Sequence, residues 1–238
     1  MAEGPVIRQP VVLNDILRNA QATGPATAAS FQGPMLLNDS FTVAVDTTNV
    51  WATSLGGTGT FARQVVSGRP LARLDCPAGA DKALCYSLKP FQPPGAASTT
   101  QDIYQRVTME WLMAFTSVAN IDNTQMVAGL NAIGAERSDI NVACFCLASD
   151  ALNTVTDAAG AETVTVVGGD AITLTNFNRY KIVMRNGTVE FWVNNTLRNT
   201  HTANILAVAT QATIGLRSEA AVTARLEFTD IRCWLSDT

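Results

Sequence analysis

The chain has 238 residues, of which 47% are hydrophobic and only 15% are charged, and its net charge is −4. Typical soluble domains carry about 25% charged residues, and the lysine count here is only three. Without a Lys/Arg stripe or an apolar run of ~20 residues, we expect neither nucleic-acid binding nor membrane insertion. The start, MAEGPVIRQP, lacks the basic and apolar regions of a secretory signal, which predicts a soluble protein made in a cytoplasm.

Residues 1–38 differ in composition from the rest of the chain. They hold four of the nine prolines and the small-residue run AQATGPATAAS. This pattern predicts an extended N-terminal arm with one short amphipathic helix, capped by Asn14. Six apolar side chains give the arm contact points for a partner: Val11, Val12, Leu13, Ile16, Leu17 and Phe31.

Residues 39–238 show the two-residue periodicity of β-strands. The stretch IYQRVTMEWLMAFTSV, residues 103–118, predicts a long strand with Val107, Met109, Trp111 and Met113 on one face. A hairpin follows at NFNRYKIVMRNGTVEFWVNN, residues 176–195. Its Asn-Gly dipeptide predicts a two-residue type I′ turn, because such turns need positive φ at both central residues.

The last predicted strand, VTARLEFTDIRCWL, changes phase in its middle. Its apolar positions run through Phe228 and then resume at Ile231, which predicts a β-bulge near Thr229–Asp230. In all, the chain offers roughly a dozen strands and no convincing long helix. The sequence therefore predicts an all-β fold, a two-sheet antiparallel β-sandwich over residues 39–238.

The five cysteines and the single histidine offer little chemistry. Cys144 and Cys146 lie two apart, so on a strand they share one face, and we interpret the cysteines as buried reduced thiols. A bridge between Cys76 and Cys85 stays an open alternative. His201 lies in the polar stretch LRNTHTAN, which predicts an exposed loop residue without a zinc or triad role.

Three stretches together carry a family resemblance. They are LLNDSFTVAVDTTNVWATSLGGTGTFARQVVSGRPLARL, RYKIVMRNGTVEFWVNNTLRNTHT and ATIGLRSEAAVTARLEFTDIRCW. Their strand order and turn chemistry resemble the concanavalin A-like lectin/glucanase jelly roll over about residues 36–238. The resemblance implies a two-sheet sandwich with its terminal strands side by side. Similar sandwiches occur in glycan-binding modules, in glycoside hydrolases and in phage virions, including proteins that decorate capsids.

A retaining glucanase of this family would carry acids in a Glu-x-Asp-x-x-Glu pattern on one strand, since its two carboxyl groups stand about 5 Å apart. The long strand offers only Glu110, which we expect to face solvent or to pair with an arginine across the sheet. The sequence therefore predicts no enzymatic activity, no catalytic residues, no cofactor and no metal.

Two functions follow from these observations. The Thr/Ala/Asn-rich, lysine-poor composition and the arm favour a non-enzymatic virion structural protein, a phage capsid decoration or cement protein. It would dock through its arm and sandwich surface on the major capsid protein or other virion subunits, as a homo-oligomer, in a virion assembled in the host cytoplasm. The alternative is a lectin-like, glycan-binding module of a phage tail or adhesin. Its candidate aromatic platforms are Trp192 and Trp51, and Trp192 lies in opposite phase to Phe191 and Val193.

Overall fold

The computed structural model describes residues 35–77, 79, 81–88, 90, 106–117, 119, 121, 124–132, 141–148, 151–168, 172–206, 208, 210–219 and 223–236. Within these residues the chain forms fifteen β-strands. They are β1 (Met35–Asp39), β2 (Trp51–Gly56), β3 (Thr60–Val66), β4 (Arg69–Cys76), β5 (Lys82–Ser87), β6 (Arg106–Phe115), β7 (Thr124–Ala132), β8 (Val142–Ala148), β9 (Ala151–Ala158), β10 (Ala161–Val166), β11 (Asn178–Arg185), β12 (Thr188–Val193), β13 (Thr196–His201), β14 (Thr210–Ser218) and β15 (Ala224–Ser236).

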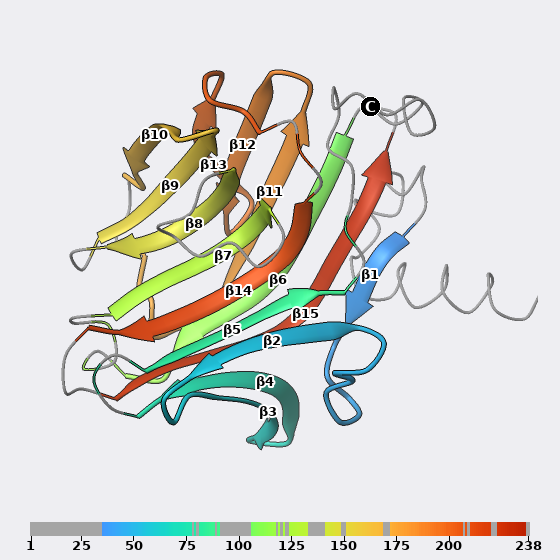
Figure 1. The fold of residues 1–238 in the computed structure, drawn as a ribbon, viewed down its shortest axis with the longest axis vertical. Helices are drawn as coiled ribbons and strands as arrows, with labels where there is room; N and C mark the ends of the chain where they lie inside the picture. Colours follow the sequence, from blue (N-terminus) through green and yellow to red (C-terminus); the bar gives the residue numbers. More distant parts are fainter. Residues whose placement is uncertain are drawn as a thin grey trace, which may run out of the picture.

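The strands form two antiparallel sheets that lie face to face (Figure 1). Sheet A has the order β13-β12-β11-β6-β15-β4-β3, and β1 also pairs with β15. Sheet B, in front in Figure 1, has the order β10-β9-β8-β7-β14-β5-β2. The predicted all-β, two-sheet antiparallel sandwich is confirmed.

The closing strand β15 holds the centre of sheet A. It pairs with β6 along one side, while its first half pairs with β4 and its second half with β1 on the other. Its pairing with β6 shifts register between Thr229 and Arg232, and Asp230 has a φ of 54°. The predicted bulge is therefore present, and it changes the phase of the side chains that follow it.

The two-residue hairpin turns use positive φ in two ways. Between β11 and β12 only Gly187 has positive φ (70°), so the predicted type I′ turn at Asn186-Gly187 is wrong. At the next turn both residues, Asn194 and Asn195, have positive φ, as a type I′ turn demands. Asparagine tolerates this region because its short side chain can hydrogen-bond locally, and the Asn194 amide donates to Asn178 Oδ1 at 2.8 Å.

The core lies between the sheets and is built from the inward face of each strand. The predicted inner face of β6 is confirmed, since its apolar side chains are at most 1% exposed. Aromatic rings join the layers: Phe145 of β8 packs edge-on against Trp111, Tyr180 and Phe191 of sheet A, at centroid distances of 5.2–6.0 Å. Such pairs add stability beyond the buried area alone.

The five cysteines are free and buried, which confirms reduced thiols and rules out the Cys76–Cys85 bridge in this structure. Burial raises the pKa of the Cys76 thiol to about 12. Cys144 and Cys146 share one face of β8, as predicted. With Leu84 and Val127 they belong to a second apolar cluster, separate from the core between the sheets. We call this surface of sheet B the outer B face.

His201 is not the exposed loop residue that its polar neighbours predicted. It ends β13, is 3% exposed and lies under three threonine hydroxyls of sheet B. Its Nδ1 lies 3.0 Å from Thr156 Oγ1, and its Nε2 lies 3.2 and 3.1 Å from Thr154 Oγ1 and Thr165 Oγ1. These contacts join the edge of sheet A to the edge of sheet B.

Residues 1–34 of the predicted arm fall outside the described residues, including its helix and its six contact residues from Val11 to Phe31. Strand β1 begins at Met35, so the sandwich starts four residues before the predicted boundary at residue 39. No helix in the described part of the chain is long and apolar enough to cross a membrane.

Candidate functional site

A row of side chains crosses the outer surface of sheet A, here called the outer A face. Strand register aligns one residue from each of six neighbouring strands, from β13 to β1. At ~4.8 Å between strands the row is about 24 Å long. In order, it consists of Leu197, Trp192, Lys181, Glu110, Arg232 and Asn38.

Trp192 lies on this outer face, as its phase predicted. Its side chain is partly exposed, its indole Nε1 donates to Glu190 Oε2 at 3.1 Å, and the ammonium group of Lys181 lies 4.4 Å from the ring centroid. The hydrogen bond and the cation–π contact hold the ring in one orientation. A fixed and partly exposed indole is suited to stacking against an apolar ligand surface.

Trp51 cannot serve as the second platform. It is fully buried, stacks on Phe41 at 6.1 Å, and donates its Nε1 hydrogen to Asp39 Oδ2 at 2.8 Å. The prediction for Trp51 is wrong because the partly buried carboxylate of Asp39 satisfies its polar atom, which lets the whole indole enter the core.

Glu110 pairs with an arginine across the sheet, as predicted. Its Oε1 lies 2.5 Å from Arg179 NH1 on β11. Among the described strands, none carries two carboxylates two positions apart. The Glu-x-Asp-x-x-Glu pattern of a retaining glucanase is therefore not found in the strands that the structure describes.

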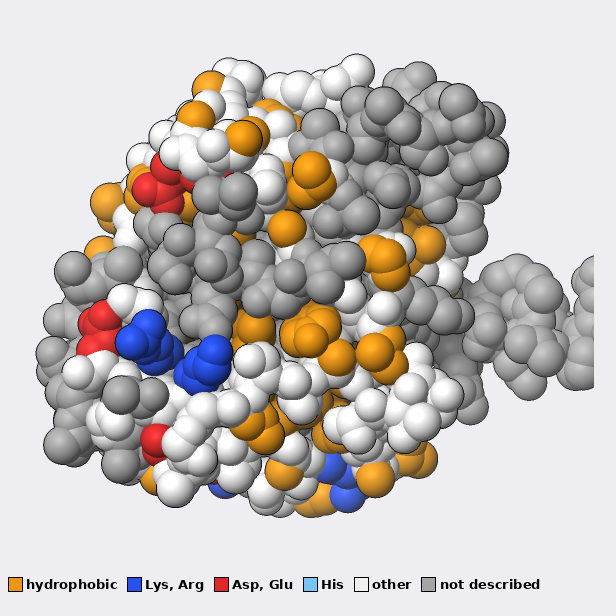
Figure 2. All heavy atoms as spheres, viewed as in Figure 1, with side chains coloured by type: hydrophobic (Ala, Val, Ile, Leu, Met, Phe, Trp, Pro, Cys, Tyr) orange, Lys and Arg blue, Asp and Glu red, His pale blue; other side chains and the backbone are white. Residues whose placement is uncertain are grey.

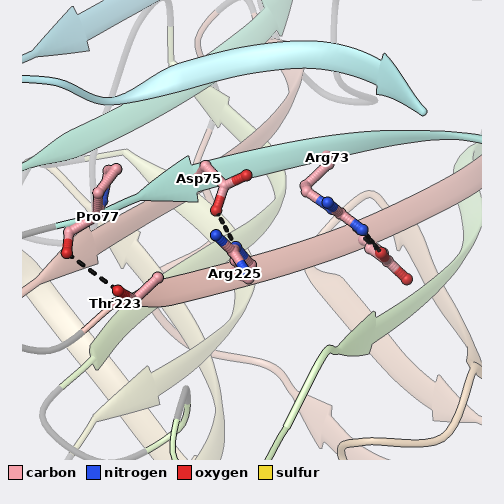
Figure 3. A network of polar contacts seen from close by, with 6 residues as sticks. Arg73, Asp75, Pro77, Thr223 and Arg225 are labelled. Atoms are coloured by element: carbon pink, nitrogen blue, oxygen red, sulfur yellow. Dashed lines mark hydrogen bonds and ion pairs between the residues drawn. The ribbon is translucent and has the colours of Figure 1, made fainter.

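Further ion pairs lie on the same face between β4 and β15 (Figure 3). Arg73 NH2 lies 2.5 Å from Glu227 Oε1, and Arg225 pairs with Asp75. Next to them, Thr223 Oγ1 donates to the carbonyl of Pro77 at 3.0 Å. These partners satisfy one another, so this end of the outer A face offers a ligand few free groups.

At Asn38 of β1, the row ends in a hollow of about 570 Å³ beside the bulge of β15. This is within the range of roughly 300–1,000 Å³ that small-molecule sites occupy. Its lining includes the bulge residues Asp230 and Arg232, and also Asn38, Asp39 and Asp46.

The carboxylates of this hollow differ in their partners. Asp39 accepts hydrogens from Phe41 N and Trp51 Nε1, each at 2.8 Å. Asp46 caps the turn after it by accepting from the Asn49 side-chain amide, Asn49 N and Thr48 N, and these hydrogen bonds lower its pKa. Both groups thus hold the loop between β1 and β2. Asp230 accepts no hydrogen bond from the described residues and is free to accept one from a ligand.

Arg232 supplies the matching donor. Arg232 is only 6% exposed, and its NH1 atom has no hydrogen-bond partner. No ion pair joins it to a described residue. A buried guanidinium nitrogen without a partner costs free energy, roughly 1–3 kcal/mol. The bulge therefore places a free acceptor and a free donor two residues apart on the wall of one hollow.

Comparisons with known proteins agree with this architecture. A β-glucanase of Bacillus licheniformis has a TM-score of 0.58 and 11% sequence identity, with 85% of this chain and 98% of that chain covered. The carbohydrate recognition domain of Emp47p has a TM-score of 0.57 and 10% identity, covering 89% and 99%. An alginate lyase from Corynebacterium sp. has a TM-score of 0.54 and 12% identity, covering 84% and 99%. The chain has the concanavalin A-like jelly-roll fold.

No protein-family model and no curated protein matches the chain. The similar structures nevertheless correct one expectation. The prediction that the protein is not an enzyme is wrong, because the same jelly roll serves glucanases and alginate lyases among these structures. The missing Glu-x-Asp-x-x-Glu pattern argues only against the catalytic arrangement of retaining glucanases. Similar structures with other activities, such as alginate lyases, share the fold. The described residues bring together no three side chains of the kind that ligate a metal.

Proposed function

We propose that the protein binds a carbohydrate in the hollow beside the β15 bulge, with further sugar units extending along the row on the outer A face. The observation that carries this proposal is the free acceptor of Asp230 next to the free donor of Arg232, in one hollow. Neighbouring hydroxyl groups of a sugar both donate and accept hydrogen bonds, so one ring can satisfy both side chains.

The row extends this site in a direction that suits a chain-like ligand. Trp192 lies three strand spacings from Arg232, about 14 Å. A sugar at that distance would stack its apolar face on the exposed part of the indole, while hydroxyls contact Lys181 and Glu110 between the two ends. The fold supports this proposal, since similar structures include a carbohydrate recognition domain and glycan-active enzymes.

The backbone at Asp230 allows a clean test. Its φ of 54° is favourable for glycine, so Asp230→Gly removes the carboxylate without straining the bulge. We expect a panel of neutral and acidic oligosaccharides, titrated against the full chain, to contain at least one saturable ligand, and Asp230→Gly to weaken it about tenfold. Asn195→Gly, at a φ of 64° in the exposed β12–β13 turn, is the matched control and should bind normally.

Trp192→Ala tests the other end of the row. We expect it to weaken longer oligosaccharides several-fold, roughly 1 kcal/mol, and to leave disaccharides unchanged. The same samples are assayed for release of reducing ends and of unsaturated products, because hydrolases and lyases share the fold. Normal binding in Asp230→Gly, or no saturable ligand in the panel, would overturn the proposal.

As a second function we propose a role as a virion component that decorates a phage capsid, assembled in the host cytoplasm. The low charge of the chain supports it, together with exposed apolar side chains such as Val43 (72%) and Val166 (61%), because such surfaces are easily desolvated by a partner. Deletion of residues 1–30 should then abolish particle binding while circular dichroism still reports a folded sandwich. Normal decoration by the truncated chain would argue against it.

A further inference from the structure

The outer A face carries more positive than negative charge around β6, β11, β12 and the second half of β15. Five cations lie here with two carboxylates, although the whole chain has a net charge of −4. The cations are Arg106, Arg179, Lys181, Arg185 and Arg232, and the carboxylates are Glu110 and Glu190. We call this set the basic patch.

Both carboxylates of the patch are already in ion pairs. Glu110 pairs with Arg179, and Glu190 lies 3.4 Å from Arg185 NH2. Lys181, Arg106 and Arg232 make no ion pair with a described residue. Arg232 has Asp230 two residues away in the hollow, and the charge of Glu190 acts on both Lys181 and Arg106. With Asp230 included, five cations face three carboxylates, so a surplus of two positive charges remains on this face of sheet A.

Two of the arginines stand directly opposite each other. Arg106 of β6 and Arg185 of β11 are register partners, and like charges in this position destabilise a sheet. The Nε atoms of both are buried without a hydrogen-bond partner. Burial, and then the charge of Arg185, lower the pKa of Arg106; burial also lowers the pKa of Lys181. This arrangement costs folding free energy that a bound anion would recover.

By contrast, the described residues of the outer B face carry a smaller group of cations. In Figure 2 Lys and Arg side chains are visible at the left and at the lower edge, and hydrophobic side chains are visible from the centre to the right. Lys82 and Arg217 are register partners there and line only a small apolar dent with Leu84 and Val127. The uncompensated charge is thus concentrated on the face that bears Trp192 and the hollow.

We infer that the basic patch selects an acidic polysaccharide, one whose uronate carboxylates contact the Arg106–Arg185 pair and Lys181. This inference rests on the proposed function, because the same glycan places one unit in the hollow. Lys181 stands opposite Glu110 in the sheet, and Glu110 is four residues from Arg106 along β6, about 13 Å. The Arg106–Arg185 pair and Lys181 are therefore far enough apart to contact carboxylates on separate units of one glycan chain. Hydroxyls of the terminal unit meet Asp230 and Arg232, since a carboxylate there would face three aspartates.

The test compares polyuronate with neutral glucan binding to the full chain, at low and moderate salt. The double variant Arg106→Gln/Lys181→Gln removes two positive charges from the patch. Arg225→Gln/Lys82→Gln is the control, because it removes two positive charges elsewhere, one from a 46% exposed arginine of β15. We expect polyuronate binding to weaken about tenfold in the patch variant and less than about twofold in the control. Added salt should weaken wild-type binding more than that of the patch variant.

The outcomes separate the two proposals. If a neutral oligosaccharide binds and depends on Asp230, but polyuronate binds no more tightly or is insensitive to the patch variant, the inference fails and the proposed function stands. Equal losses in patch variant and control would show a net-charge effect and also overturn the inference. Tighter binding of single-stranded nucleic acid than of polyuronate would assign the patch to another ligand class. If no glycan binds the wild-type chain, both proposals fail together.

Discussion

The outer faces of the two sheets differ, although the inner faces of both are lined with buried apolar side chains. The outer B face buries an apolar cluster that includes Cys144, Cys146 and Val127. The outer A face is laid out in charged and polar rows, with ion pairs such as Arg73–Glu227 and Arg179–Glu110. One face is therefore governed by packing, and the other by electrostatics. The difference points to the outer A face as the one available for polar recognition.

The largest expected effect tests packing on the outer B face. A Cβ added at Gly129 of β7 would lie 2.3 Å from the carbonyl oxygen of Ala143 and 2.6 Å from Cys144 Cα. Because these are backbone atoms of the paired strand β8, Gly129→Ala should lower the free energy of unfolding by about 3 kcal/mol. Urea unfolding followed by tryptophan fluorescence measures it.

Gly215→Ala is the matched control on the same face. Its added Cβ would meet side-chain atoms, Leu84 Cδ1 at 2.5 Å and Val127 Cγ1 at 2.9 Å. Side chains can change rotamer, so we expect a loss of about 1 kcal/mol. If the two variants lose the same stability, close backbone approach does not govern the outer B face.

An intermediate effect tests charge on the outer A face. The Glu227 side chain is 9% exposed and pairs with Arg73, so Glu227→Gln leaves a partly buried guanidinium without its counter-charge. We expect a loss of about 2 kcal/mol in chemical denaturation. Asp75→Asn breaks the neighbouring pair with Arg225, whose side chain is 46% exposed, and should cost only about 0.5 kcal/mol. A reversed order would mean that burial does not set the strength of these pairs.

The sequence predicted the inner faces well because burial on one side of a strand leaves a two-residue period. The four inward residues predicted for β6 are all buried, and the phase break at Thr229–Asp230 located the bulge. The same phase break was the one sequence signal near the hollow, because the bulge residues Asp230 and Arg232 line it. The hollow itself could not be predicted, because it needs Asn38 of β1 beside Arg232 of β15, and their pairing follows from the complete sheet.

The errors at Trp51 and His201 share one physical cause, which is that their polar atoms found partners in other strands or loops. Trp51 enters the core because Asp39 accepts its indole hydrogen. His201 is buried because threonines of β9 and β10, about 36–47 residues before it, replace water around its ring. Local polarity predicted exposure for His201, and only the folded sheets supply the compensating hydroxyls.

A smaller effect than those of Gly129→Ala and Glu227→Gln is expected at the seam between the two sheets, where His201 contributes neither close backbone packing nor an ion pair. Burial lowers the pKa of His201 below its usual value near 6.5. The folded chain therefore binds fewer protons than the unfolded chain between the two pKa values, and stability falls as pH drops below about 6.5. We expect acidification from about pH 7.5 to about pH 5.5 to cost the wild type roughly 1 kcal/mol more than His201→Gln.

The comparison with His201→Gln isolates the contribution of this residue, because the carboxylates titrate alike in both proteins.

The hydrogen bonds around His201 also define which ring nitrogen carries the proton. Thr156 Oγ1 donates to the Ala203 carbonyl at 3.1 Å, so it accepts from Nδ1–H and leaves Nε2 to accept from Thr165. A proton added at Nε2 would convert that acceptor into a donor within a site that offers hydroxyls and no described carboxylate. Parallel stability curves for the two proteins would show that the seam tolerates the charge, and the acid sensitivity would then belong to the ion pairs of the outer A face.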